Sequence, residues 1–363
     1  MNGIYIHIPF CRSKCIYCDF YSLPQLKQAS AIVDGIIAEY NKRRGELDSP
    51  AETLYIGGGT PSAIPAEMLG NIVNQIDTSR VKEFTIEVNP DDVNEQTVES
   101  WLRIGVNRIS MGVQSLDDNI LRRLGRRHNA RQAINAITTI RNSGITNVNC
   151  DLIYGIPGMS HATWRSSLET LMECGLSHLS AYCLTYHEGT FLHKLLTTGK
   201  IKAADDDDIA EQYEALCKTA SLKGMEHYEI SNFAMPGHRS CHNSLYWSPE
   251  GRWLGLGPSA HSYDGRIRRI DIPDTHTWLD RLPSPFTIDE EDDNDRINDI
   301  IVTSLRTLEG LDLNSLPGET AVSVSRNAAR FVAAGAMTMS GSHLAIRPAY
   351  WLISDSFIRE VIV

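Results

Sequence analysis

Six short apolar segments alternate with amphipathic helical segments in the first half of the chain, and this alternation restricts the fold more than any other feature. Apolar strands that are separated by helices form parallel sheets whose two faces are covered. Six such units fit an open barrel better than a closed barrel of eight units. The pattern therefore predicts an α/β fold, a partial (β/α)6 TIM-like barrel. Its strands are expected at Ile4–Ile8, Thr53–Ile56, Phe84–Val88, Arg108–Met111, Val148–Ile153 and His178–Leu184, with helices at Ala29–Arg44, Ala66–Ile76, Glu95–Ile104, Ala130–Ser143 and Ala162–Cys174.

The second half of the chain has a different pattern. A helix is expected at Asp206–Lys223, and the Pro- and acid-rich stretch Pro283–Asp295 is expected to be a linker. A helix, a turn, a second helix and a hairpin around Ser340–Ser342 indicate a small winged-helix-like α+β domain at the C-terminus. The expected division is a barrel at 1–185, a barrel extension at 186–285 and the small domain at 286–363.

Charge and hydropathy exclude several classes of function. The chain has 34 basic and 45 acidic residues and a net charge of −11, which argues against a broad nucleic-acid footprint. No apolar stretch is long enough to span a bilayer, and the N-terminus lacks the pattern of a secretory signal. We therefore expect a cytoplasmic protein with no nucleic-acid partner and no membrane contact except through a partner protein.

Three of the eight cysteines lie within eight residues, directly after the first expected strand. Cys11, Cys15 and Cys18 form a C-x3-C-x2-C pattern, which is compact enough for one loop to surround a metal centre. A cubane iron–sulfur cluster normally takes four thiolates, so three thiolates leave one iron open to an exchangeable ligand. The alternatives are a zinc site whose fourth ligand lies elsewhere, or three unrelated thiols. The other five cysteines are scattered singly and are expected to be buried or idle thiols.

The C-x3-C-x2-C loop after the first strand of a partial barrel resembles the signature of the radical S-adenosylmethionine (SAM) superfamily. The resemblance implies a [4Fe–4S] cluster held by Cys11, Cys15 and Cys18, and SAM bound at its open iron. The glycine loop Gly57–Pro61 follows the second strand, and polar side chains follow the next ones, at the edge where ligands of parallel α/β folds collect. By resemblance to the oxygen-independent coproporphyrinogen III oxidase-like branch, the residues that would contact SAM are Tyr5, Tyr17, Gly58, Gly59, Thr60, Glu87, Gln114, Arg126 and Asp151.

Two features separate the subgroups of this branch. The oxidases carry a fourth cysteine two residues after the third, and this chain has Phe20 at that position. The oxidases also have an extension before their first strand, whereas the first strand of this chain is expected to begin at residue 4. The stretch His242–Trp247 matches the HNxxYW motif of HemW-type heme chaperones, to which heme binding is attributed. The resemblance implies that His242 ligates heme iron and that Tyr246 and Trp247 pack on the porphyrin. Cys241, His238 and His261 are alternative ligands.

The resemblance favours a HemW-like heme chaperone that binds a cluster, SAM and heme and transfers heme to an acceptor protein, for instance a respiratory one. It implies an electron donor such as flavodoxin or ferredoxin, and it leaves open whether the chain turns over as an enzyme. One alternative is an oxygen-independent coproporphyrinogen III dehydrogenase of porphyrin biosynthesis. Another is a zinc-stabilised binding module without a redox role.

A further glycine pattern, Gly255–Ala260, matches the dinucleotide motif G-x-G-x-x-A. Pro258 cannot donate a backbone N–H, and the residues that follow predict a hairpin around Asp264–Gly265 instead of a helix. We therefore expect no nicotinamide or flavin site. By the family resemblance, this stretch is expected to be a loop near the mouth of the site.

Overall fold

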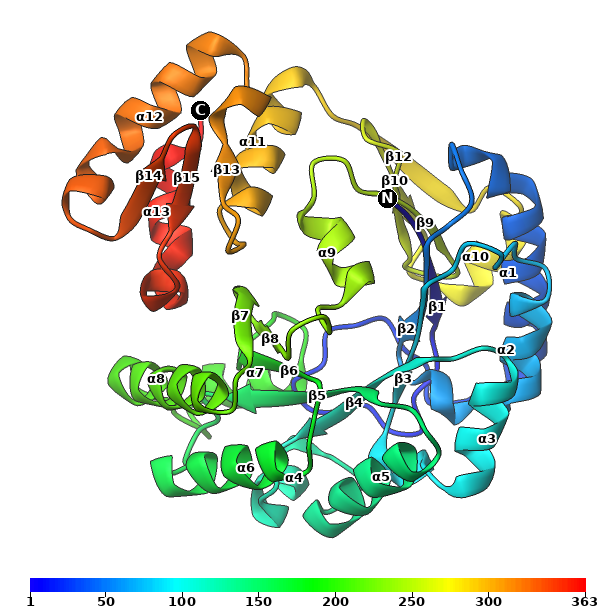
Figure 1. The fold of residues 1–363 in the computed structure, drawn as a ribbon. Helices are drawn as coiled ribbons and strands as arrows, with labels where there is room; N and C mark the ends of the chain where they lie inside the picture. The colour runs from blue at the N-terminus through cyan, green and yellow to red at the C-terminus, as the bar shows by residue number, and fades with distance from the viewer.

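A computed structural model describes residues 1–363, and its main feature is a curved sheet of twelve strands with helices on its outer face (Figure 1). Six of the strands run parallel and pair in chain order, as the alternating pattern predicts. The sheet does not close on itself, so the barrel is partial. These strands are β1 (Asn2–Ile8), β2 (Thr53–Gly58), β3 (Glu83–Val88), β4 (Arg108–Gln114), β5 (Asn147–Tyr154) and β6 (His178–Cys183).

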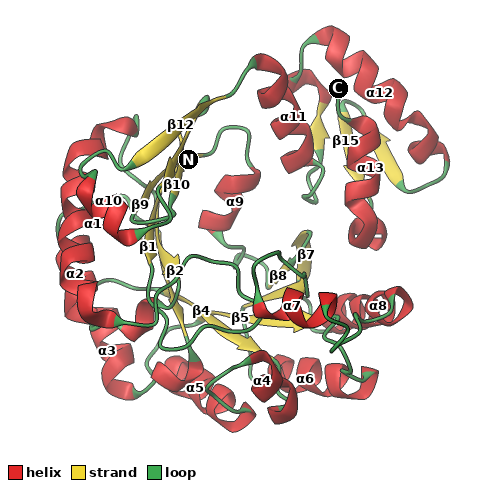
Figure 2. Ribbon diagram, turned by 180° about the vertical axis from the view of Figure 1, so that it is seen from behind, coloured by secondary structure: helices red, strands yellow, loops and turns green.

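Six helices cover the outer face of these strands (Figure 2). Their apolar sides pack on the strands in one hydrophobic core, which includes Ile32 of α1 and Trp101 of α3. Arg126 lies just beyond the end of α4, because Gly125 adopts a left-handed conformation and ends that helix. The six helices are α1 (Ala29–Arg43), α2 (Ala66–Val73), α3 (Glu95–Arg103), α4 (Asp118–Leu124), α5 (Ala130–Asn142) and α6 (His161–Glu173).

On the β1 side, four strands extend the sheet. β9 (Arg252–Leu256) pairs parallel with β1, and β10 (His261–Tyr263), β11 (Ile267–Asp271) and β12 (Phe286–Glu290) follow in antiparallel order. The hairpin around Asp264–Gly265 is confirmed. Two expectations are wrong here. Gly255 and Leu256 belong to β9 instead of a loop, because β9 pairs with β1 from the other end of the chain. Residues 286–290 form an edge strand instead of a linker, because they pair with β11, the strand that precedes them.

On the β6 side, the sheet ends in the hairpin of β7 (Glu226–Glu229) and β8 (Asn232–Ala234), with β8 antiparallel to β6. The expected long helix is α8 (Asp206–Leu222), and α7 (Phe191–Thr197) precedes it. The short helix α9 (Cys241–Trp247) contacts β1 and β2, and α10 (Thr275–Asp280) contacts α1. Helix α9 therefore lies on the inner side of the curved sheet (Figure 1).

The C-terminal part has its own three-stranded sheet in the order β13-β15-β14. The expected hairpin joins β14 and β15, with Gly341 at a positive φ of 59° in its turn. The sequence interpretation missed the last helix, α13. The elements are α11 (Asp293–Ser304), β13 (Leu311–Asp312), α12 (Gly318–Ala333), β14 (Met337–Ser340), β15 (His343–Ile346) and α13 (Ser354–Val361). Across the whole chain, no helix combines the length and the apolar character needed to cross a membrane.

Candidate functional site: two adjoining cavities

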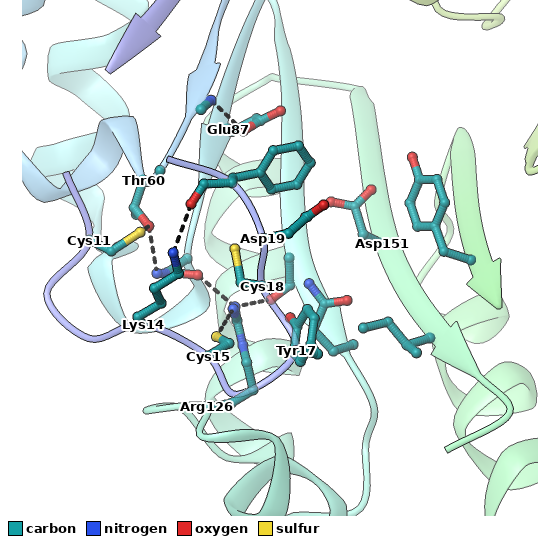
Figure 3. Close-up of a pocket in the computed structure, with 18 of the residues that line it drawn as sticks. Cys11, Lys14, Cys15, Tyr17, Cys18, Asp19, Thr60, Glu87, Arg126 and Asp151 are labelled. Carbon is teal, nitrogen blue, oxygen red and sulfur yellow. Dashed lines mark hydrogen bonds between the residues drawn. The ribbon is translucent and has the colours of Figure 1, made fainter. Parts of the chain in front are cut away.

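A cavity of about 550 Å³ lies at the carboxyl ends of the parallel strands, where the cysteine loop meets the glycine loop (Figure 3). All three clustered cysteines line it. Of the nine residues expected to contact SAM, all but Tyr5 line it as well: Tyr17, Gly58, Gly59, Thr60, Glu87, Gln114, Arg126 and Asp151. The fold therefore brings these residues together from four strands and three loops.

The three thiols share this cavity but point to different partners. Cys11 Sγ lies 3.3 Å from Thr60 Oγ1, and the Arg126 guanidinium donates to Cys15 Sγ over 3.3 Å. Burial raises the pKa of the Cys18 thiol to about 11. No three His, Cys, Asp or Glu side chains stand close enough together to hold a metal ion as placed. The donor set still fits a cluster, because three thiols on one short loop line one cavity and thiolates are the usual ligands of iron–sulfur clusters.

The glycine loop approaches the cysteine loop so closely that a side chain would not fit. A Cβ on Gly59 would lie 2.6 Å from the Phe10 carbonyl oxygen, and Gly58 has a positive φ of 110°. The Gly58 N–H donates to Glu87 Oε2 over 3.1 Å. Glycine at these positions therefore sets how near the two loops lie to each other.

Two carboxyl groups line the cavity from neighbouring parts of the sheet. Burial raises the pKa of Glu87 to about 7, with a further contribution from the charge of Asp151. Burial also raises the pKa of Asp151, although Asn149 Nδ2 donates to its Oδ1 over 2.7 Å. The Tyr55 hydroxyl donates to Glu87 Oε1 over 2.9 Å, which orients that carboxyl. These groups can accept hydrogen bonds from the hydroxyl or ammonium groups of a ligand.

Gln114 and Arg126 are held in special geometries at the end of β4. Gln114 has a positive φ of 67° and lies at an irregularity in the pairing with β5. The Arg126 guanidinium donates to the Gly112 carbonyl and to Asn89 Oδ1, each over 2.6 Å. A positive φ outside glycine is uncommon and clusters at functional sites. The backbone here is therefore shaped to place these side chains at the cavity.

A second cavity of about 480 Å³ adjoins the first, and Glu87, Tyr182 and Ser231 line both. Tyr5 lines this second cavity instead of the first. The three residues of the His242–Trp247 motif that were expected to contact heme line it too: His242, Tyr246 and Trp247. The two sets of predicted site residues thus occupy neighbouring cavities inside one curved sheet.

Both ring nitrogens of the buried His242 have hydrogen-bond partners. Nδ1 lies 2.8 Å from Thr53 Oγ1, and Nε2 lies 2.9 Å from the Tyr246 hydroxyl. The imidazole stacks on Tyr55 with a centroid separation of 5.0 Å. Burial, helped by the charge of Arg108, lowers the pKa of His242 to about 3. The ring is therefore neutral at physiological pH, which is the form that ligates metals.

Helix α9 is anchored to the sheet by Glu83, which sequence reasoning missed. The Cys241 and His242 backbone N–H groups each donate to the Glu83 carboxylate over 2.9 Å. Thr53 and Tyr55 were missed as well. The alternation of side chains along a strand could have identified them, because side chains two residues apart share a face. Glu83 therefore shares the inner face of β3 with Glu87. Thr53 shares the inner face of β2 with Tyr55.

The alternative heme ligands lie elsewhere. Cys241 precedes His242 on α9 but does not line the second cavity, and burial beside the Glu83 carboxylate raises the pKa of its thiol to about 11. His238 lies before α9, and His261 is exposed on β10; neither of them lines the second cavity. The geometry thus favours His242 among the four candidates.

Comparisons with known proteins show the family and the fold of this chain. Residues 5–171 match the model of the radical SAM superfamily. A "heme chaperone HemW" of Lactococcus lactis is 34% identical over 80% of this chain and 77% of its own length. A protein with the same description from Mycobacterium tuberculosis is 31% identical over 99% and 94% of the two chains. The coproporphyrinogen III oxidase (HemN) of Escherichia coli superposes with a TM-score of 0.86 over 100% and 90% of the chains at 19% identity, which shows a shared fold.

Proposed function

The chain belongs to the HemW family of the radical SAM superfamily, and on that basis we propose that it is a heme chaperone that holds heme in the second cavity and passes it to an acceptor protein. This proposal adds to the family membership, since it assigns the heme to particular side chains of this protein. The neighbouring cysteine cavity would hold the [4Fe–4S] cluster and SAM that the radical SAM family implies.

The environment of His242 carries the proposal. A histidine that ligates a metal through one nitrogen usually donates the other N–H to an oxygen, which fixes the ring. Thr53 Oγ1 at Nδ1 can take that role, and it leaves Nε2 as the ligating atom. Nε2 is otherwise partnered by one hydroxyl, that of Tyr246, which a ligand can displace. Flat aromatic side chains, among them Tyr5 and Trp247, line the same cavity and can pack against a porphyrin.

Cys11, Cys15 and Cys18 would hold the cluster, and the cavity residues listed above would hold SAM. When bound, the cluster and SAM would supply one-electron chemistry. The chain's own contribution is binding and orientation. Arg126 places a positive charge beside the Cys15 sulfur and would stabilise its thiolate. Glu87 and Asp151 supply acceptors at the edge that the two cavities share.

The position of Phe20 favours the chaperone over the coproporphyrinogen oxidation that the HemN fold also hosts. The oxidase motif requires a fourth cysteine at this position, and here a phenylalanine with 64% of its surface exposed lines the cysteine cavity. A zinc-stabilised module would need a fourth protein ligand beside the three thiols. The radical SAM match over residues 5–171 favours the iron–sulfur reading instead.

A heme titration of the full-length protein tests the proposal. We expect the wild type to bind one heme with a shifted Soret band, and we expect His242→Ala to weaken binding roughly tenfold or more and to change the band, because it removes the axial ligand. His276→Ala is the matched control, since that side chain is exposed on α10. An unchanged affinity and spectrum of His242→Ala would show that heme binds elsewhere.

The remaining assignments extend the same proposal. Heme would leave the chain for an acceptor protein, for instance a respiratory one, and an electron donor such as flavodoxin or ferredoxin would reduce the cluster. The protein would act in the cytoplasm. The division at 1–185, 186–285 and 286–363 also remains a proposal, with β12 assigned to the sheet of the barrel instead of the small domain.

A further inference from the structure

The wall of the second cavity carries acidic groups but no lysine or arginine, and its one histidine, His242, is neutral. Glu87 and Glu229 line it, together with tyrosines, amides and a serine, and no Lys or Arg is among its lining residues. Heme and its precursors carry propionates, which are anions at neutral pH. Burial raises the pKa of both carboxyl groups to about 7, so above that pH the two carboxylates of this wall repel a carboxylate that is brought against it.

Glu229 is the more buried of the two acids and is incompletely satisfied. It ends β7 with 1% of its surface exposed. Its Oε2 accepts from the Ser231 N–H over 3.3 Å, and its Oε1 has no hydrogen-bond partner. Asn232 Oδ1, from the same hairpin, lines the cavity and is also without a partner. The hairpin thus presents two unpartnered oxygen atoms and no Lys or Arg to this side of the cavity.

The charged groups around Glu229 do not cancel this effect. Arg306, which approaches from beyond α11, attracts the carboxylate, but its guanidinium also donates to Asp355 over 2.6 Å. Arg306 does not line the cavity. The phenols of Tyr182, Tyr213 and Tyr228 near Glu229 stay neutral, and burial lowers the pKa values of His227 on the same strand and of His242 across the cavity, so these imidazoles add no positive charge. Burial raises the pKa of Glu229 to about 7, so the carboxylate is ionised in mildly alkaline solution.

Tetrapyrroles differ in the pyrrole rings to which their propionates are attached. Heme carries its propionates on two adjacent pyrrole rings, so one edge of the macrocycle is apolar and the other is anionic. Coproporphyrin carries a propionate on each of its four rings, so every edge is anionic. Heme can therefore enter an acidic cavity with its apolar edge first, whereas a coproporphyrin in any orientation brings a carboxylate against the wall.

We propose that Glu229 is a specificity residue of the second cavity, which admits a tetrapyrrole with an apolar edge and rejects one with carboxylates on every ring. The inference rests on the proposed heme-binding function and adds an orientation to it. The apolar edge of heme lies toward Glu229, and its propionates lie toward solvent.

Binding of heme and of iron coproporphyrin III to the full-length protein tests this inference, because both ligands offer the same iron to His242. At about pH 8.5, above the pKa of Glu229, we expect the wild type to bind iron coproporphyrin at least about tenfold more weakly than heme. Glu229→Gln removes the charge with little change of shape and should reduce that ratio about tenfold. Glu226→Gln is the matched control, since Glu226 lies on the same strand, pairs with Arg239 and does not line the cavity.

A second measurement needs no variant and stands even if Glu229→Gln folds poorly. Iron coproporphyrin tetramethyl ester has the rings of the acid without its charges, and we expect the wild type to bind the ester at least about tenfold more tightly than the acid. Equal binding of heme, acid and ester by the wild type, or an unchanged ratio in a folded Glu229→Gln, would overturn this inference while heme binding stands. Absence of heme binding by the wild type would overturn the proposed function, and the inference with it.

Discussion

At the scale of single residues, the proposed heme site depends on a neutral imidazole, that of His242, whose Nε2 is covered by the Tyr246 hydroxyl. His242 was identified from its motif, because the sequence itself carries the spacing of His242 and Tyr246. Its partner Thr53 lies 189 positions away in the chain, and no local sequence pattern predicts that contact. The same holds for Glu229, whose importance comes from a cavity that exists only in the fold.

Replacing Tyr246 with phenylalanine should make heme binding faster and roughly fivefold tighter. The Tyr246 hydroxyl occupies Nε2 of His242, and losing a hydrogen bond of about 1 kcal/mol removes this competition while the aromatic ring stays. Stopped-flow mixing with heme at the Soret band measures the rate. Tyr186→Phe serves as control, because that hydroxyl has no partner and lines neither cavity. Slower or weaker binding by Tyr246→Phe would mean that the hydroxyl holds heme instead.

Glu229 should also make stability depend on pH. Its pKa is raised from 4.5 to about 7, so the folded state keeps a proton that the unfolded state loses. The stability that this proton provides is complete below about pH 4.5 and is lost as the pH rises through 7, by at most about 3 kcal/mol. Urea unfolding from about pH 5 to 8 should therefore show the wild type losing stability relative to Glu229→Gln. Parallel pH curves for the two proteins would contradict the raised pKa.

At the scale of elements, the strands and helices of the first half could be predicted because each carries its own periodicity. The segments that were predicted wrongly are those whose conformation depends on pairing with another strand. The family resemblance predicted a loop where β9 ends, and the proline and acidic residues around β12 resembled a linker, yet β9 is held by β1 and β12 is held by β11. Helix α9 was recognised as a motif, but its anchor on β3 was not.

Removing that anchor should loosen α9 selectively. Glu83→Ala deletes the carboxylate that accepts the Cys241 and His242 N–H groups, and it leaves the buried Arg108 without its ion-pair partner at 4.0 Å. We expect a loss of about 3 kcal/mol in global stability and faster amide hydrogen exchange across α9 than in the barrel helices. Glu83→Gln, which keeps one acceptor oxygen, should lie between the wild type and Glu83→Ala. Unchanged exchange in α9 would rule out this anchoring role.

The spacing of the glycine loop should be equally sensitive. A methyl group on Gly59 meets the backbone of Phe10 at 2.6 Å, so Gly59→Ala should displace the cysteine loop and lower cluster content by roughly half or more. Gly45→Ala is a matched control, since a Cβ there meets nothing within 4 Å. Iron and acid-labile sulfide after anaerobic reconstitution provide the measurement. Full cluster content in Gly59→Ala would show that the close approach is not required.

At the scale of the whole molecule, one curved sheet holds two ligand sets side by side. The cysteine loop and the glycine loop face one cavity, His242 faces the next, and Glu87, Tyr182 and Ser231 belong to both. Sequence motifs identified the members of each set. They could not show that the two cavities adjoin, because that depends on α9 folding back inside the sheet (Figure 1).

The most direct test of this arrangement is a heme titration of one anaerobically reconstituted preparation, with iron, acid-labile sulfide and heme determined on the same sample. The account predicts that one heme binds per chain while the sulfide content stays constant, because the cluster and heme use different side chains. Loss of sulfide as heme binds, or a Soret shift that requires the three clustered cysteines, would contradict it.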